Sequence, residues 1–238
     1  MFNFHIPAPS EDSRRLILVD VGSAGGLQDK WRRHHRKVRS VLFEPNPAEA
    51  ANLRRLSPSG MMVVENGLAA VAGAHTLHLA HWPGCSSLLE HDPAVLTGYK
   101  IAPLYQPEAE ATVACVRDDE LYRTGHVPAP DVIKVDVEGY EYQVLSGFGD
   151  LLHGVLGIET EAWFYPVFKD QKLLHDLVAL LAPFGLRLRR IETVDGFEGD
   201  LVCANAYFTR GKAGHPDLPP GQRQKFSLLQ RVWHLDAR

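Results

Sequence analysis

Residues 16–26 read LILVDVGSAGG, an apolar run of strand length that ends in a glycine-rich turn. Glycines in such a turn let the backbone approach a ligand closely, and a helix that follows points its first N–H groups at the same place. A strand that enters a helix in this way is the first half of a βαβ unit. The stretch therefore predicts an α/β fold with a ligand site at the carboxyl end of its first strand.

The remainder of the chain repeats this alternation of short apolar runs and segments with helical spacing. Further strands are predicted at 41–43, 61–65, 76–80, 111–116, 131–137, 155–159, 186–191 and 204–209. Helices are predicted at 26–38, 48–56, 140–152, 173–184 and 222–233. The pattern favours a mostly parallel sheet that is finished by an antiparallel pair, the last two strands.

Residues 82–110 interrupt this rhythm with prolines, glycines, serines and aromatic residues. Long segments of this kind are often functional, so we predict a lid or insertion there. The rest of the pattern predicts one domain over 16–210. An N-terminal extension, 1–15, precedes it, and a linker with a C-terminal helix, 211–238, follows it.

The composition excludes several classes of protein. Of the 238 residues, 45% are hydrophobic and 23% are charged, which suits one sizeable core and excludes disordered and fibrous chains. The net charge of −4 provides no global positive field, so no nucleic-acid partner is expected. A basic run, 30–39, is interpreted as a solvated helix face, with an anionic acceptor or partner as the alternative.

The spacing of the cysteines and the length of the apolar runs indicate the cellular compartment of the protein. Cys85, Cys115 and Cys203 lie far apart without C-x-x-C spacing, so the sequence predicts neither a disulfide framework nor a zinc ribbon. The chain has no signal-peptide pattern and no apolar run of about 18 residues, so no transmembrane segment is expected. A cytoplasmic protein is predicted, and its oligomeric state is left open.

The glycine-rich turn also indicates which ligand it binds. A dinucleotide fingerprint needs glycine where Ala24 stands, whereas Asp20, Gly22 and Gly26 match acid-x-Gly-x-x-x-Gly, which is similar to the first motif of S-adenosylmethionine (AdoMet) methyltransferases. The acid can accept a hydrogen bond from the ammonium group of that ligand, while it would repel a pyrophosphate. A tight structural turn is the alternative.

Two further residues extend the predicted cofactor site. Glu44 ends the second strand, 22 residues beyond Gly22, where an acid can bind both ribose hydroxyls. Asn66 follows the third strand, where the adenine edge would lie. A helix-capping acid and an ordinary Asn-Gly turn are the respective alternatives.

The most specific stretch is IKVDVEGYE at residues 133–141. Strand alternation sends Lys134, Asp136 and Glu138 to one face. Three charges on a central strand are costly unless they face a cleft or pair with one another. The rim of an active site is the natural place for them, and an ion-pair ladder on an edge strand is the alternative.

These motifs, in this order, resemble the FkbM-type methyltransferases over residues 16–208. The resemblance rests on Asp20-x-Gly22, FEPNP at 43–47, Asn66-x-x-Ala69, Ser86-Ser87-Leu88, and IKVDVEG at 133–139. It implies a Rossmann-like class I methyltransferase sheet of seven strands with AdoMet as cofactor. It also implies O-methylation of a hydroxyl on a sugar, glycan, glycolipid or polyketide-type product.

The resemblance also suggests site residues. For the cofactor these are Asp20, Gly22, Ser23, Gly26, Glu44, Pro45 and Asn66. Ser23 is included because the family usually has Asn where this chain has Ala24, so that contact needs a replacement. The family also usually has Leu where Asp118 stands.

The same resemblance places Asp136 and Glu138 at the reaction centre. A hydroxyl acceptor must lose its proton, so Asp136 is predicted as the general base or as an acceptor-orienting group, with Glu138 setting its protonation or serving as the base. A divalent metal between the two acids is conceivable, but two carboxylates alone do not define a metal site. Residues predicted to contact the acceptor are Ser87, Lys134, Glu161 and Trp163, the last as part of an aromatic wall for which plain packing is the alternative.

Two other classes of function stay open on these residues. An NAD(P)-dependent oxidoreductase is disfavoured by the failed glycine pattern and by Asp20. A non-catalytic module that keeps the cofactor fold is the second. A small-molecule, glycan-linked or lipid-linked acceptor is the expected partner of the enzyme.

Overall fold

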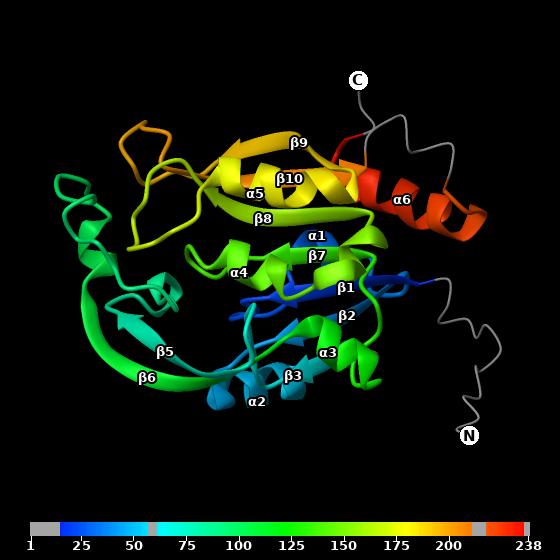
Figure 1. Ribbon diagram of the computed structural model, residues 1–238, viewed down its shortest axis with the longest axis horizontal. Helices are drawn as coiled ribbons and strands as arrows, with labels where there is room; N and C mark the ends of the chain where they lie inside the picture. Colours follow the sequence, from blue (N-terminus) through cyan, green and yellow to red (C-terminus); the bar gives the residue numbers. More distant parts are fainter. Residues whose placement is uncertain (1–14, 57–60, 211–217, 236–238) are drawn as a thin grey trace.

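A seven-stranded sheet forms the centre of the molecule in the computed structural model, which describes residues 15–56, 61–210 and 218–235 (Figure 1). In spatial order its strands are β3 (Met61–Val64), β2 (Val38–Phe43), β1 (Leu16–Val21), β7 (Val132–Val135), β8 (Gly157–Trp163), β10 (Cys203–Arg210) and β9 (Leu186–Thr193). The first five are parallel, and β10 is antiparallel to both neighbours. The predicted mixed sheet with an antiparallel final pair is confirmed.

Strand boundaries differ from the prediction at two informative places. β2 begins at Val38 rather than at residue 41, and β7 ends at Val135 rather than at residue 137. Glu138 and Gly139, just beyond the predicted end of β7, adopt left-handed backbone angles, with φ of 56° and 91°. Such angles cannot continue an extended strand.

The helices predicted over 26–38, 140–152 and 173–184 are shorter in the structure, whereas those predicted over 48–56 and 222–233 are each one residue longer and one further short helix is not predicted. The helices are α1 (Asp29–Arg32), α2 (Pro47–Leu56), α3 (Asp118–Arg123), α4 (Glu141–Ser146), α5 (Leu174–Leu181) and α6 (Pro220–Val232), with 3₁₀ segments η4 (Gly149–His153) and η5 (Ala182–Phe184). The single helix predicted over 140–152 is therefore wrong, since α4 and η4 are separate and Gly149 has φ of 50°. The helix predicted over 26–38 is reduced to the four residues of α1, because Gly25 and Gly26 are left-handed.

Strand alternation gives the sheet two apolar faces. Val19 and Ile133 face a core that includes side chains of α4 and α5. Leu18 and Val132 face the opposite core, which includes Trp31 of α1 and side chains of α2 and α6. Figure 1 shows α3, α4 and α5 in front of the sheet and α1 behind it. The C-terminal helix thus covers the same face as the helices that follow β1 and β2.

A second, three-stranded sheet flanks the predicted insertion, 82–110. Its strands are β4 (Gly67–Leu68), β6 (Pro107–Val116) and β5 (Gly73–Ala80), in that order, with η2 (Pro83–Cys85) and η3 (Ala102–Tyr105) between β5 and β6. A separate apolar cluster packs Leu96 and Tyr105 of the insertion against Trp163 and Phe168. The insertion is therefore anchored by its own core beside the end of β8 (Figure 1).

The remaining predictions concern the chain ends. Residues 1–14 of the predicted extension and 211–217 of the predicted linker lie outside the described residues. The predicted C-terminal helix is confirmed and begins at Pro220, two residues before its predicted start. Among the described residues, every helix is too short or too polar to span a bilayer.

Candidate active site

The glycine turn after β1 lies directly against the segment that follows β7. Gly22 has φ of 78°, and a Cβ atom there would lie 1.9 Å from the carbonyl oxygen of Asp136. The amide of Asp136 donates to the carbonyl of Val21 at 3.1 Å. Only glycine permits both the left-handed angle and this approach. The fold thus brings the first and the most specific of the sequence motifs into contact.

The rest of the turn is held by its own hydrogen bonds. The hydroxyl of buried Ser23 donates to the carbonyl of Asp20 at 2.7 Å, and the amide of Gly25 donates to Glu49 of α2 at 3.0 Å. Gly26 donates from its amide to the carbonyl of Ser23 at 2.8 Å. Ser23 therefore stabilises the turn from within, and a contact of its hydroxyl with a cofactor stays a prediction.

The predicted ribose and adenine residues follow the next two strands. Glu44 comes directly after β2, is 6% exposed and accepts the amide N–H of Asn46 at 2.9 Å, and burial raises the pKa of its carboxyl. Pro45 is half-buried beside it. Asn66 follows β3, and its side-chain amide donates to the carbonyl of Ala114 at 3.3 Å. All three lie at the carboxyl edge of the sheet, as predicted.

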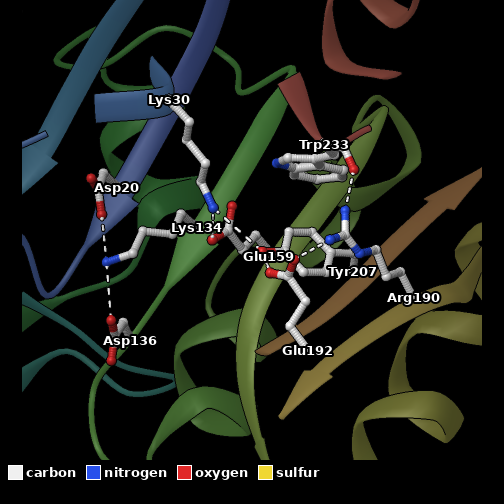
Figure 2. Close-up of polar contacts among 9 residues, drawn as sticks. All are labelled: Asp20, Lys30, Lys134, Asp136, Glu159, Arg190, Glu192, Tyr207 and Trp233. Carbon is white, nitrogen blue, oxygen red and sulfur yellow. Dashed lines mark hydrogen bonds and ion pairs between the residues drawn. The ribbon is translucent and has the colours of Figure 1, made fainter. Parts of the chain in front are cut away.

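Charged side chains cross the three central strands in one row (Figure 2). Asp20 of β1, Lys134 of β7 and Glu159 of β8 are cross-strand partners, and all three are buried. The Lys134 ammonium lies 3.2 Å from Asp20 and 3.3 Å from Asp136, while Lys30 of α1 lies 2.5 Å from Glu159. Lys134 and Asp136 thus pair on one face, as strand alternation predicts.

The pKa values of the charged side chains in this row follow from their burial and from their ion pairs. Burial raises the pKa of Asp20 to about 6, against the opposing effect of Lys134. Burial also raises the pKa of the Glu159 carboxyl, although Lys30 opposes it. Burial lowers the pKa of the Lys134 ammonium, but Asp20 and Asp136 outweigh that effect and the net pKa is raised. Lys134 therefore remains a cation, and the adjacent carboxyls share its charge.

The row continues through a polar cluster to the C-terminal helix (Figure 2). Lys30 donates to the hydroxyl of Tyr207 at 3.4 Å, and that hydroxyl donates to Glu192 at 2.5 Å. Arg190 pairs with Glu192 and donates to the carbonyl of Trp233 at 2.6 Å. This cluster ties α1, β9, β10 and the end of α6 to the centre of the sheet.

The basic run over 30–39 is mostly solvated, as predicted, with Arg32, Arg33, Arg36 and Lys37 exposed, but only its first residues are helical and Lys30 departs from the pattern. Lys30 reaches inward to Glu159, and Trp31 is fully buried. Arg33 and Lys37 are exposed, but they lie in the turns beyond the end of α1. The short helix uses one of its bases to compensate a buried carboxyl.

Three carboxyls converge beside the glycine turn. One carboxylate oxygen from each of Asp136, Glu138 and Glu161 lies within 4.8 Å of the others. Burial and mutual repulsion raise the pKa of Glu138 and of Glu161 well above the ordinary value. Such a set can accept a proton, and it is also a set of hard oxygen donors that a divalent cation binds.

Glu138 is held in its left-handed conformation by three neighbours. Ser87 of the insertion donates its hydroxyl to the Glu138 carbonyl at 2.6 Å, and the Tyr105 hydroxyl donates to its carboxylate at 3.5 Å. Glu141 accepts the amide N–H groups of Val137 and Gly139 at 3.2 and 3.1 Å. Backbone strain of this kind persists where the surroundings impose it, commonly at functional sites. In this structure Ser87 therefore stabilises the backbone conformation of Glu138.

Three residues of this arrangement escape the sequence analysis. Glu141 belongs to the quoted motif, and Glu159 alternates with Glu161 on β8, so both carry a signal in the sequence. Tyr105 carries none, because the fold of the insertion brings it to Glu138. By contrast, Trp163 of the predicted aromatic wall is 1% exposed and packs edge-on against Phe168, with ring centres 5.7 Å apart.

The topology and this site define a class of protein. Five parallel strands in the order β3-β2-β1-β7-β8, the antiparallel pair β10-β9 and a glycine turn after the central β1 form the class I AdoMet-dependent methyltransferase fold. Residues 20–187 match the model of the Methyltransferase FkbM domain, and the chain belongs to this family. The resemblance seen in the sequence is confirmed. The family is one of methyltransferases, and AdoMet is the methyl donor that membership in it implies.

A curated relative extends the similarity. Hexuronic acid methyltransferase AglP of Haloferax volcanii is 31% identical over 143 residues, which cover 58% of this chain and 52% of the relative. The chain thus spans about half the length of the curated relative it matches.

Two solved structures match the chain at low identity and with TM-scores below 0.5. A putative S-adenosylmethionine-dependent methyltransferase from Listeria monocytogenes is 8% identical with a TM-score of 0.48, covering 84% of this chain and 93% of that one. Magnesium protoporphyrin IX methyltransferase from Synechocystis, with bound SAM, is 8% identical with a TM-score of 0.45, covering 84% and 73%. The assignment of the fold rests on the strand order and the family.

Proposed function

We propose that this chain is an AdoMet-dependent O-methyltransferase that methylates a sugar hydroxyl of a glycan or glycolipid. The contact between the Gly22 turn and Asp136 is the observation that carries the proposal. It joins the predicted donor-binding turn to a cluster of carboxyls at the same edge of the sheet. In an open α/β sheet, this edge is where ligands bind.

The charge of the site fits a cationic donor. Five carboxyls, those of Asp20, Asp136, Glu138, Glu159 and Glu161, face two ammonium groups, those of Lys30 and Lys134. A sulfonium and an ammonium group gain from this excess of acid, whereas a pyrophosphate loses. When bound, AdoMet supplies an electrophilic methyl group on a positively charged sulfur. Asp20, Gly22, Gly26, Glu44 and Asn66 are the residues we assign to hold it.

Asp136 is the residue we assign as general base. Its side chain is 42% exposed, whereas that of Lys134 is 7% exposed, so Asp136 is the accessible end of the ion pair. A carboxylate there can accept the proton of an acceptor hydroxyl as the methyl group is transferred. Glu138 and Glu161 lie beside Asp136, with a carboxylate oxygen of each within 4.8 Å of one of its own, and burial together with repulsion among these acids raises the pKa of both.

The acceptor class draws support from the relative named for a hexuronic acid. A hexuronic acid offers both hydroxyls and a carboxylate. A carboxylate beside Asp136, Glu138 and Glu161 would be repelled, so the charge of the site favours a hydroxyl.

Calorimetry and methyl transfer test the proposal. We expect S-adenosylhomocysteine to bind the purified chain and NAD⁺ not to bind. Labelled methyl groups from AdoMet should then appear on an oligosaccharide that contains uronic acid, as an ether that survives mild alkali. A product that mild alkali hydrolyses would be an ester and would contradict the hydroxyl assignment. Binding of NAD⁺ alone would indicate an oxidoreductase, and donor binding without transfer to any acceptor tested would support a binding module.

Asp136→Asn tests the role of the base. Loss of a general base lowers turnover by about 10²–10⁴-fold. We expect that loss in kcat, with the affinity for S-adenosylhomocysteine changed by no more than about twofold. A kcat equal to that of the wild type would remove Asp136 from catalysis.

A further inference from the structure

Lys134 occupies an unusual place in the site. It lies on central strand β7, is 6% exposed, and its ammonium contacts carboxylates from two different strand ends. One partner, Asp20, precedes the donor-binding turn, and the other, Asp136, is the assigned base. Figure 2 shows the Lys134 side chain extended between these two carboxylates.

The fold leaves Lys134 little freedom to bind an acceptor, the role predicted from the sequence. Its side chain is 7% exposed, and two carboxylates lie within 3.3 Å of its ammonium group. Desolvated ammonium groups in such pairs are held strongly, because loss of either partner leaves a buried charge uncompensated. The ammonium group is therefore directed at the two acids rather than at bound substrate.

Asp136 depends on this contact. Among the described residues, Lys134 is the cation that lies within 4 Å of its carboxylate. The other close charged groups are Glu138 and Glu161, which repel it. Without an adjacent cation, the Asp136 carboxylate would turn away from these acids or take up a proton. Either change would prevent it from accepting a proton from the acceptor.

We propose that Lys134 is a positioning residue, whose ammonium holds the Asp136 carboxylate ionised and oriented toward the acceptor while also neutralising Asp20 beneath the donor. This inference rests on the proposed function, since it assigns Lys134 a part in that reaction. It joins the donor side and the acceptor side of the site through one buried cation.

Lys134→Met and Lys134→Arg, made in the full chain, test the inference by kinetics. We expect Lys134→Met to lower kcat about 10–100-fold and to move the acidic limb of the pH–rate profile about one pH unit higher, with KM for AdoMet changed less than about threefold. In Lys134→Arg the acidic limb of the pH–rate profile should lie at its wild-type pH, because arginine keeps the positive charge. If Lys134→Met does not fold, Lys134→Gln, which keeps a hydrogen-bond donor without the charge, takes its place.

A double-mutant cycle shows whether Lys134 acts through Asp136. In an Asp136→Asn background, Lys134→Met should change kcat by less than about twofold, because the group it positions is already neutral. Lys30→Met is the matched control, since it removes the other ammonium of the row without touching Asp136. It should leave the pH–rate profile in place. Additive losses in the cycle, or a rise in acceptor KM alone, would overturn the inference.

A titration separates this inference from the proposed function. NMR of carboxyl-¹³C aspartate follows the ionisation of Asp136 without turnover. We expect that ionisation at higher pH in Lys134→Met than in the wild type, and at the wild-type position in Lys30→Met. An unshifted titration overturns the inference even if methyl transfer is observed. A shifted titration supports it, and failure of methyl transfer would then count against the proposed function alone.

Discussion

Asp20 and Asp118 are two carboxyls that the fold buries to the same degree, each 1% exposed. Asp20 lies at the end of β1 with the Lys134 ammonium 3.2 Å away. Asp118 begins α3, and among the described residues its two carboxylate oxygens, like those of Asp20, have no hydrogen-bond partner, but Asp118 also has no cation beside it. Burial raises the pKa of Asp20 to about 6 and that of Asp118 to about 7, where repulsion by Asp119 adds to burial.

The difference between the two sites is the counter-ion. At the carboxyl edge of the sheet, buried Asp20 pairs with the Lys134 ammonium, which also pairs with Asp136, the proposed general base. At the start of α3, Asp118 has no cation beside it in the described part of the chain, and the family resemblance leads one to expect Leu at this position. A buried charge without compensation destabilises a fold. The first site therefore carries charge that a reaction can use, while the second carries charge with no partner in the described structure.

The largest effect on stability is expected from breaking the compensated site. Lys134→Met leaves Asp20 buried without a cation, so we expect a loss of about 3–5 kcal/mol in the free energy of unfolding at pH 8. At pH 5 the loss should shrink, because Asp20 can take up a proton in place of the ion pair. Urea unfolding at the two pH values measures this. An equal loss at both would show that packing of the lysine stem, and not its charge, supports the site.

Removal of the charge at Asp118, which has no cation beside it in the described structure, should raise the free energy of unfolding rather than lower it. The pKa of Asp118 rises from 3.8 to about 7 on folding, so the folded protein binds more protons than the unfolded chain between these values, and stability falls as the pH rises through them. Asp118→Leu should therefore raise the free energy of unfolding by about 2–4 kcal/mol at pH 8 and by close to zero near pH 4.

Urea unfolding across this pH range measures the gain from Asp118→Leu. Asp118→Asn is the control that removes the charge while keeping the shape, so its gain over the wild type should depend on pH in the same way as that of Asp118→Leu. A gain from Asp118→Leu that is independent of pH would assign the effect to packing, and the contrast with Asp20 would then no longer rest on charge.

The smallest effect is expected from the outer ion pair of the row. Lys30→Met leaves Glu159 without its cation, but the Lys30 side chain is 30% exposed and water can replace part of the interaction. We expect a loss of about 1–2 kcal/mol in the free energy of unfolding, smaller than that of Lys134→Met. Thermal unfolding of the two variants side by side provides the comparison. A loss as large as that of Lys134→Met would make Lys30 an equal part of the central site.

Much of the fold could be read from local patterns. The strand predicted at Leu16–Val21 and the acid at Glu44 lie where the sequence places them. Both signals are local, because strand periodicity and turn chemistry depend on neighbours in the chain. The helix predicted over 26–38 is wrong for the same reason: helical spacing does not reveal that left-handed glycines delay the start and that Val38 pairs with β1.

The candidate site was only partly predictable. Asp20, Asp136 and Glu138 carry their signal in short motifs, whereas their partners come from distant segments. The contact of Tyr105 with Glu138 requires the fold of the insertion, and that of Lys30 with Glu159 spans 129 residues. No local pattern encodes which side chains meet across strands, because register and crossover geometry decide it.

The sequence by itself therefore determined the α/β class, the donor-binding turn and the acids at the strand ends, since each depends on the conformational preferences of a few consecutive residues. Only the tertiary structure decided that Lys134 bridges Asp20 and Asp136, that Ser87 and Tyr105 hold Glu138, and that Asp118 is buried with no cation beside it among residues 15–56, 61–210 and 218–235. The physical reason is that burial and Coulomb pairing are properties of positions in space. Within the residues that the structure describes, the same residue type, Asp, thus has a cation beside it at the carboxyl end of β1 and none at the start of α3.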